Sequence, residues 1–163
     1  MLVRRAQPSD LREVVAIERA AFGDPWPTEA FESLLERETA WFSVAEGQAG
    51  VLGYLVAIMV LDEAEVANLA VEHSARGRGV GSALLDAALQ DARVRGVMSV
   101  FLEVRESNQA ARALYESRGF EPVGRRKGYY RRPPEDAIVL RRTLADRPGP
   151  PGSGPVVTPS VPR

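Results

Sequence analysis

The chain has 163 residues, 45% of them hydrophobic, and its formal net charge of −1 gives no electrostatic reason to bind nucleic acid or an anionic membrane. This length supports one domain with a core of its own. Because the sequence has no cysteine and a single histidine, His73, it excludes disulfides, thiol catalysis, cysteine metal sites and histidine clusters.

The sequence predicts neither a membrane span nor a signal peptide. No apolar run is long enough to span a membrane, and the first residues lack the pattern of a signal peptide, so we expect a cytoplasmic protein. Residues 146–163 are rich in proline, glycine and serine and contain almost nothing apolar to bury. We therefore predict one domain over residues 1–145 and a disordered tail, to which we assign no function.

The first part of the chain predicts a strand and two helices. Residues 2–6 are typical of a short strand, and a helix then starts near Pro8 and continues to Phe22. A Gly-Asp-Pro run ends this helix, and a second one follows with Thr28 as its expected N-cap. The aromatic residues Phe22 and Trp26 flank the loop between them. They form either a hydrophobic plug over the core or a wall of a substrate site.

Three strand-like runs come next, at residues 41–47, 51–61 and 65–71. Short turns separate them, so we expect an antiparallel meander. The last of the three leads directly into a glycine-rich loop.

This loop contains Gly77, Gly79 and Gly81 and opens a helix whose apolar residues recur at helical spacing. Helix starts leave backbone N–H groups unpaired, and glycines let a phosphate approach the backbone, so the loop predicts an anion cradle. The alternative is an ordinary connection with solvated arginines. The loop contains no lysine, which excludes a Walker loop, whereas a dinucleotide fold stays open because Glu103 lies near the end of the next strand.

That next strand, residues 97–104, is almost continuously apolar, as expected for a central strand covered on both faces. The crossover helix before it makes it parallel to the strand at 65–71. Glu103 is the only ionisable residue inside the run. It is either a solvated carboxylate paired with Arg105 or a catalytic base in a buried setting.

A last helix opens at Ser107-Asn108 and ends at Gly119, with Tyr115 on its apolar stripe. A tyrosine in this position serves packing or chemistry. Two strands, 120–126 and 136–144, then finish the sheet. The segment between them, with Tyr129 and Tyr130, is either a recognition lid or a basic loop that covers a sheet edge.

Three motifs resemble those of the GCN5-related N-acetyltransferases. RGRGVG resembles the family's pyrophosphate-binding signature, residues 102–120 resemble its following strand and helix, and NLAV resembles its bulged strand beside the cofactor. The resemblance covers about residues 1–144. It is closest to the RimI type, the bacterial ribosomal-protein-alanine N-acetyltransferases, whose pieces are similar in order and spacing to VLDEAEVANLAV, LEVRESN, ALYESRGF and GYY followed by EDAIVL. The RRPP segment departs from that pattern and could change which N-termini are accepted.

The resemblance implies an α/β fold with a mixed, mostly antiparallel sheet of six to seven strands, helices on both faces, and a parallel, splayed pair of fourth and fifth strands. Acetyl-coenzyme A would lie in the split, which answers the dinucleotide alternative. Its pantetheine would pair with the backbone of Leu69, Ala70 and Val71, and Asn108 would hydrogen-bond the cofactor arm. The pyrophosphate would lie on the cradle formed by Arg76, Gly77, Arg78, Gly79, Val80, Gly81 and Ser82.

The resemblance also implies the activity, which is direct transfer of acetyl from acetyl-coenzyme A to the α-amino group of a protein N-terminus. The expected target is an N-terminal alanine of a small-subunit ribosomal protein. Glu103 would be the general base and Tyr115 the general acid, with Trp26, Tyr129 and Tyr130 contacting substrate. We expect a monomer that needs no metal and has neither a nucleic-acid nor a membrane partner.

Two other functions compete with this one. A lysine or small-amine acetyltransferase would use the same cofactor site, although basic residues near the tyrosine pair are expected to repel polyamines: Arg125, Arg126, Lys127, Arg131 and Arg132. A catalytically silent module that binds acetyl-coenzyme A is the other. The presence of both Glu103 and Tyr115 argues against a silent module.

Overall fold

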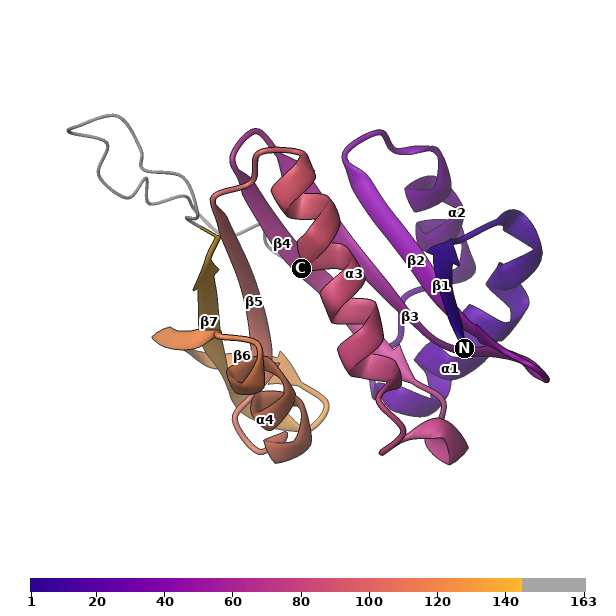
Figure 1. The fold of residues 1–163 in the computed structure, drawn as a ribbon. Helices are drawn as coiled ribbons and strands as arrows, with labels where there is room; N and C mark the ends of the chain where they lie inside the picture. The colour runs from indigo at the N-terminus through magenta and orange to yellow at the C-terminus, as the bar shows by residue number, and fades with distance from the viewer. Residues whose placement is uncertain (145–163) are drawn as a thin grey trace.

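One seven-stranded sheet, in the order β1-β2-β3-β4-β5-β7-β6, organises residues 1–144, the part of the chain that this computed structural model describes (Figure 1). The predicted boundary at residue 145 and the predicted tail lie outside these residues. The strands are β1 (Leu2–Arg5), β2 (Ala40–Gly47), β3 (Gly50–Val60), β4 (Glu63–Val71), β5 (Ser99–Arg105), β6 (Glu121–Arg131) and β7 (Pro134–Thr143). The helices are α1 (Leu11–Ala21), α2 (Thr28–Glu36), α3 (Val80–Val94) and α4 (Gln109–Ser117), with single 3-10 turns at Pro8–Asp10 and His73–Ala75.

Helices cover both faces of the sheet because their apolar stripes need a partner. The stripe of α3 and the inner side of α4 pack on one face, with Leu84, Leu85 and Tyr115 in the same cluster as Leu55 and Leu102. The stripes of α1 and α2 pack on the other face, in a cluster that includes Phe31 and Tyr54. In Figure 1, α3 crosses in front of the sheet, whereas α1 and α2 lie beyond it. The predicted mixed sheet with helices on both faces is confirmed.

The parallel pair β4–β5 separates halfway along its length. Pairing runs from Glu63 opposite Ser99 to Val66 opposite Leu102 and then ends, although both strands continue. At this point β4 carries a bulge, because Val56 of β3 pairs with Asn68 while its neighbour Ala57 pairs with Val66. A bulge adds twist and bends the strand away from its neighbour. The predicted splay is therefore confirmed, and a bulge lies where it starts.

The β6–β7 hairpin is longer than we predicted. The predicted strands 120–126 and 136–144 were joined by a loop, but β6 continues through both tyrosines to Arg131, which pairs with Pro134. The pairing register shifts between Arg126 and Tyr130, and the bulge there contains Gly128, whose φ is +62°. The Asp136 carboxylate accepts a hydrogen bond from the Gly128 N–H at 2.9 Å and fixes this bulge. The connecting turn is thus two residues long.

The expected N-cap of α2 was also wrong by one position. Pro27, not Thr28, caps this helix, and the structure gives Pro27 no side-chain capping bond. Proline has extended backbone here, with φ −71° and ψ 160°, which suits a residue just before a helix.

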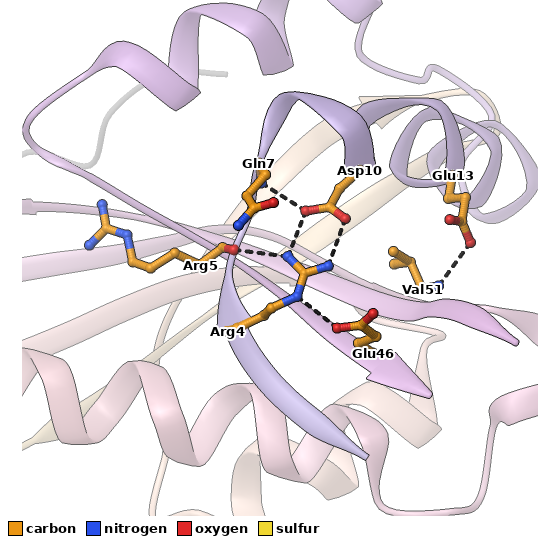
Figure 2. A network of polar contacts seen from close by, with 7 residues as sticks. All are labelled: Arg4, Arg5, Gln7, Asp10, Glu13, Glu46 and Val51. Carbon is orange, nitrogen blue, oxygen red and sulfur yellow. Dashed lines mark hydrogen bonds and ion pairs between the residues drawn. The ribbon is translucent and has the colours of Figure 1, made fainter. Parts of the chain in front are cut away.

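A polar cluster ties the first strand to the rest of the sheet (Figure 2). The Arg4 guanidinium donates to both carboxylate oxygens of Asp10, at 2.8 and 2.9 Å, and to Glu46 at 2.8 Å. The Gln7 N–H adds a bond of 2.7 Å to Asp10. These bonds join β1, the start of α1 and β2 at one edge of the sheet. Strand β3 lies between this cluster and β4, where the split begins.

Candidate functional site

A cleft of about 660 Å³ borders the end of β4, beyond the last residue that pairs with β5. Part of its wall comes from the end of β4, part from the start of α3 and part from α4. Eleven of the residues predicted to bind the cofactor or to act in catalysis line it: Leu69, Ala70, Val71, Arg76, Gly77, Gly79, Val80, Gly81, Ser82, Asn108 and Tyr115. The fold therefore brings the end of β4 beside α4, although α3 and β5 lie between them in the sequence.

The glycine-rich loop turns the chain into α3 through two left-handed residues. Gly77 has φ +77°, and Gly79, the N-cap, has φ +80°. A Cβ at either position would meet no atom within 4 Å, so the backbone conformation requires glycine there and packing does not. The first helical bond runs from the Ala83 N–H to the Gly79 carbonyl at 3.0 Å. The three preceding N–H groups lie at the helix start, where an anion is favoured.

The two arginines of the loop differ in position. Arg76 lines the cleft, and its Nε donates to the Val71 carbonyl at the end of β4, at 3.3 Å. Arg78 is exposed and is not part of the cleft wall. The structure therefore brings Arg76, but not Arg78, to the predicted anion site.

Asn108 lies across the cleft at the start of α4. It is the N-cap of that helix, and its side-chain oxygen accepts a hydrogen bond from the Ala111 N–H at 3.1 Å. Capping uses one lone pair of the carboxamide oxygen, and the amide nitrogen is the group that can donate a hydrogen bond to a cofactor.

Tyr115 and Glu103 lie on opposite faces of the sheet. Tyr115 is only 7% exposed, and its ring contacts Phe120 on the α3 side with centroids 5.7 Å apart. On β5, Leu102 and Val104 point to that same side, so Glu103 between them points to the face of α1 and α2. The split between β4 and β5 is where the two faces communicate.

The Glu103 side chain is 7% exposed and pairs with Arg126 of β6, whose Nε lies 3.0 Å from Oε1. Arg126 also lies over the Tyr129 ring, 5.5 Å from its centroid. The proposed solvated pair between Glu103 and Arg105 is absent from the ion pairs of residues 1–144; Arg105 instead pairs with Glu135 at 3.3 Å. Glu103 is therefore a largely buried carboxylate with a cationic partner.

The tyrosine pair is held against β5. Tyr129 and Tyr130 form an edge-to-face contact with centroids 5.1 Å apart, and the Arg105 guanidinium lies 4.2 Å from the Tyr130 centroid. Arg105 also donates to the carbonyls of Arg132 and Pro133, at 3.1 and 2.9 Å. The hairpin end is thus fixed on the strand that carries Glu103.

Trp26 is not part of the cleft wall. Its ring packs on Phe31 of α2, with centroids 5.5 Å apart, and belongs to the periphery of the core between α1, α2 and the sheet. Its neighbour Phe22 does line the cleft. Of the two aromatic residues, the structure brings Phe22 to the split and places Trp26 as a plug.

The chain matches the model of the acetyltransferase (GNAT) family over residues 11–120. It belongs to this family. The [ribosomal protein bS18]-alanine N-acetyltransferase of Escherichia coli K12 is 35% identical over 136 residues, covering 82% of this chain and 91% of that protein. The N-alpha-acetyltransferase RimI of Mycobacterium tuberculosis is 41% identical over 128 residues, covering 76% and 78%. The crystal structure of the ribosomal-protein-S18-alanine N-acetyltransferase from Escherichia coli superposes with a TM-score of 0.83 at 32% identity, covering 91% of this chain and 96% of that one. The resemblance inferred from the motifs is confirmed.

In this acetyltransferase two arginines of the hairpin are paired with carboxylates, so the hairpin repels cations less than the sequence indicated. Arg125 donates to Glu106 at 2.7 and 2.8 Å and to Asp136 at 2.9 Å. The same contacts lower the pKa of both carboxyl groups; for Asp136 the largest cause is the Gly128 N–H. With Arg126 paired to Glu103, two of the five cations in our argument against polyamines are neutralised. That argument was therefore too strong.

Three features of the acetyltransferase escaped the sequence reasoning. Arg126 reaches Glu103 across β7, and no local pattern indicates this contact. Gly23 lies so close to Arg132 that a Cβ there would be 2.5 Å from the Arg132 carbonyl oxygen. Glu18 is 1% exposed in the core. Only Glu18 had a signal, as a charged residue on the apolar stripe of α1.

No helix among residues 1–144 is long and apolar enough to cross a membrane.

Proposed function

We propose that this chain transfers acetyl from acetyl-coenzyme A to the α-amino group of a protein N-terminus, with the N-terminal alanine of a bS18-type ribosomal protein as its target. The observation that carries the proposal is the split sheet, with Tyr115 on one face and Glu103 on the other. A donor on the α3 side and an acceptor on the α1 side would meet there. The names of the relatives support the choice of acceptor.

The donor site would use the edge of β4 beyond Val66. Pairing with β5 ends at Val66, so the backbone of Leu69, Ala70 and Val71 borders the cleft on that side. A pantetheine arm can pair with such an edge as an added strand does. The N–H groups at the start of α3, with Arg76 beside them, suit the pyrophosphate.

The reaction is written as a direct transfer. The neutral amine attacks the thioester carbonyl carbon, forming the C–N bond, while Glu103 takes the amine proton directly or through a water. The C–S bond then breaks, and Tyr115 gives its phenolic proton to the departing thiolate. An α-amino group has a reference pKa of about 7.7–8.0, so a modest base suffices near neutral pH. No covalent enzyme intermediate is needed.

We further propose that the protein works as a cytoplasmic monomer on a protein substrate, without a bound metal and without nucleic-acid or membrane partners. Tyr129 and Tyr130 would contact the first residues of the acceptor. They lie on the hairpin whose end meets the α1–α2 loop at Gly23. The Trp26 ring packs on Phe31 and is not part of the cleft wall. Trp26 would therefore act on the acceptor indirectly, by positioning that loop.

The experiment is acetyl-coenzyme A consumption by the purified protein with three kinds of acceptor: peptides with a free N-terminus, N-acetylated peptides that contain lysine, and spermidine. Turnover confined to free N-termini, highest with alanine first, is the expected result. Turnover on the blocked peptides or on spermidine would contradict the proposal in favour of a side-chain or small-amine acetyltransferase. Binding of acetyl-coenzyme A without any turnover would indicate a silent module.

A further inference from the structure

A carboxyl group is buried between α1 and the sheet, outside the machinery proposed above. Glu18 is 1% exposed, on the same stripe of α1 as Val14 and Ile17. Its Oε1 accepts a hydrogen bond from the Trp26 backbone N–H at 3.0 Å. Its Oε2 accepts one from Asn68 Nδ2 at 2.6 Å and another from the Tyr54 hydroxyl.

The three donors are neutral and come from three different segments: the α1–α2 loop, β3 and β4. Burying a carboxyl group is costly unless hydrogen bonds replace its lost water, and an apolar side chain would fill the same stripe more cheaply. Glu18 therefore does more than fill the core. It joins three backbone segments at one point.

One of these segments is the bulge that begins the split. Asn68 is the first residue of β4 beyond the bulge to pair with β3, and it directly precedes Leu69 at the cleft. Before the bulge Val66 packs on the α3 side, whereas after it Leu69 and Val71 do, so the bulge reverses which residues face the cleft. The bond from Asn68 to Glu18 holds β4 in the side-chain alternation that follows the bulge.

The second segment is the loop on the acceptor face. The Trp26 N–H is fixed by Glu18, and Gly23 in the same loop touches Arg132 at the tip of the β6–β7 hairpin. One carboxyl group thus holds two parts of the proposed site. Through Asn68 it holds the edge of β4 that would bind acetyl-coenzyme A, and through Trp26 it holds the loop that would border the acceptor.

We propose that Glu18 is a positioning residue for acetyl transfer, aligning the bulged edge of β4 with the acceptor loop; the proposal rests on the function proposed above. It predicts a kinetic effect beyond loss of folded protein. Unfolding of a fraction of the enzyme lowers apparent kcat and leaves KM unchanged. Misalignment of the β4 edge with the acceptor loop lowers kcat and also raises the KM for the peptide.

The test compares Glu18→Gln with Asp10→Asn, in which another buried carboxylate is replaced, in the cluster of Arg4 at the β1 edge of the sheet. Kinetics are measured below the Tm of each variant with an alanine-first peptide. Glu18→Gln is expected to lower kcat by about tenfold and to raise the peptide KM. Asp10→Asn is expected to lose Tm but to keep both constants.

A double variant tests the geometry itself. Glu18→Gln with Asn68→Asp exchanges carboxylate and amide at unchanged size, so the amide of residue 18 donates to the carboxylate of residue 68. This swap is expected to recover part of the lost kcat. If Glu18→Gln fails to fold, Tyr54→Phe replaces it, because this variant removes one hydrogen-bond donor and keeps the ring. The same effects on kcat and on the peptide KM are expected.

Direct titration of acetyl-coenzyme A separates the two proposals, since it needs no turnover. Weaker binding to Glu18→Gln than to Asp10→Asn supports the role at β4 even if the acceptor is misassigned. Parallel loss of Tm in both variants, with unchanged KM, unchanged acetyl-coenzyme A affinity and no recovery in the swap, would overturn the positioning role.

Discussion

Arg126 Nε lies 3.0 Å from Glu103 Oε1, although the two residues stand on strands separated by β7. The arginine spans β7 and meets the proposed base on the face of the sheet where the acceptor would enter. It also covers the ring of Tyr129. One side chain therefore links the hairpin to the carboxylate that would take the proton.

Replacing Arg126 by alanine is expected to lower kcat/KM by about tenfold, or ~1.4 kcal/mol of transition-state stabilisation, because Glu103 loses the contact that orients it. Steady-state kinetics with an alanine-first peptide measure the effect. The matched control is Arg125→Ala, which removes an arginine paired with Glu106 and Asp136. Equal losses in both variants would mean that the hairpin, and not Glu103, is what the arginines support.

Adding one methyl group at Gly23 is expected to raise the peptide KM and to leave the affinity for acetyl-coenzyme A unchanged. A Cβ there would meet the Arg132 carbonyl oxygen at 2.5 Å, so the α1–α2 loop and the hairpin must separate. Gly124→Ala on the same hairpin is the control, since its Cβ would find Val139 at 3.8 Å, an ordinary contact. An unchanged peptide KM in Gly23→Ala would remove the loop contact from the acceptor site.

The cluster of Figure 2 predicts an acid-sensitive contribution to stability. The bonds from Arg4 are the largest cause that holds the pKa of Asp10 below its ordinary value, and the Gln7 N–H adds to it. A lowered folded-state pKa stabilises the fold above the unfolded-state value of about 3.9, and this stabilisation is lost as the pH falls through the folded-state value.

Urea unfolding of the wild type and of Asp10→Asn at several pH values measures this contribution. Near neutral pH the variant is expected to be less stable by about 1.5–3 kcal/mol, the usual contribution of hydrogen bonds to a charged group. The difference should shrink below pH about 4. A difference that is independent of pH would show that the Asp10 charge contributes nothing.

Local patterns were sufficient for the turn into α3 and for the parallel pair, whereas the full sheet and its split were implied by the resemblance to the acetyltransferase family. Glycines with positive φ at Gly77 and Gly79, followed by apolar residues at helical spacing, determine the turn into α3 without help from distant residues. The order of strand, helix and strand then makes β4 and β5 parallel.

Contacts between distant segments were beyond the sequence pattern. The hairpin continues past Gly128 because Asp136 fixes a bulge there, and the pattern of glycine and prolines around it is typical of a loop. Trp26 could be plug or wall until its contact with Phe31 was known. The link between Arg126 and Glu103 depends on strand order, which no spacing reports.

The most direct test of the central claim is the kinetics of Glu103→Gln and Tyr115→Phe with an alanine-first peptide, together with titration of acetyl-coenzyme A into each variant. Loss of a general base or acid is expected to lower kcat by about 10²–10⁴-fold, with the affinity for acetyl-coenzyme A retained. Variants that keep their kcat, or that lose acetyl-coenzyme A affinity and nothing else, would contradict the assignment of these two residues across the split.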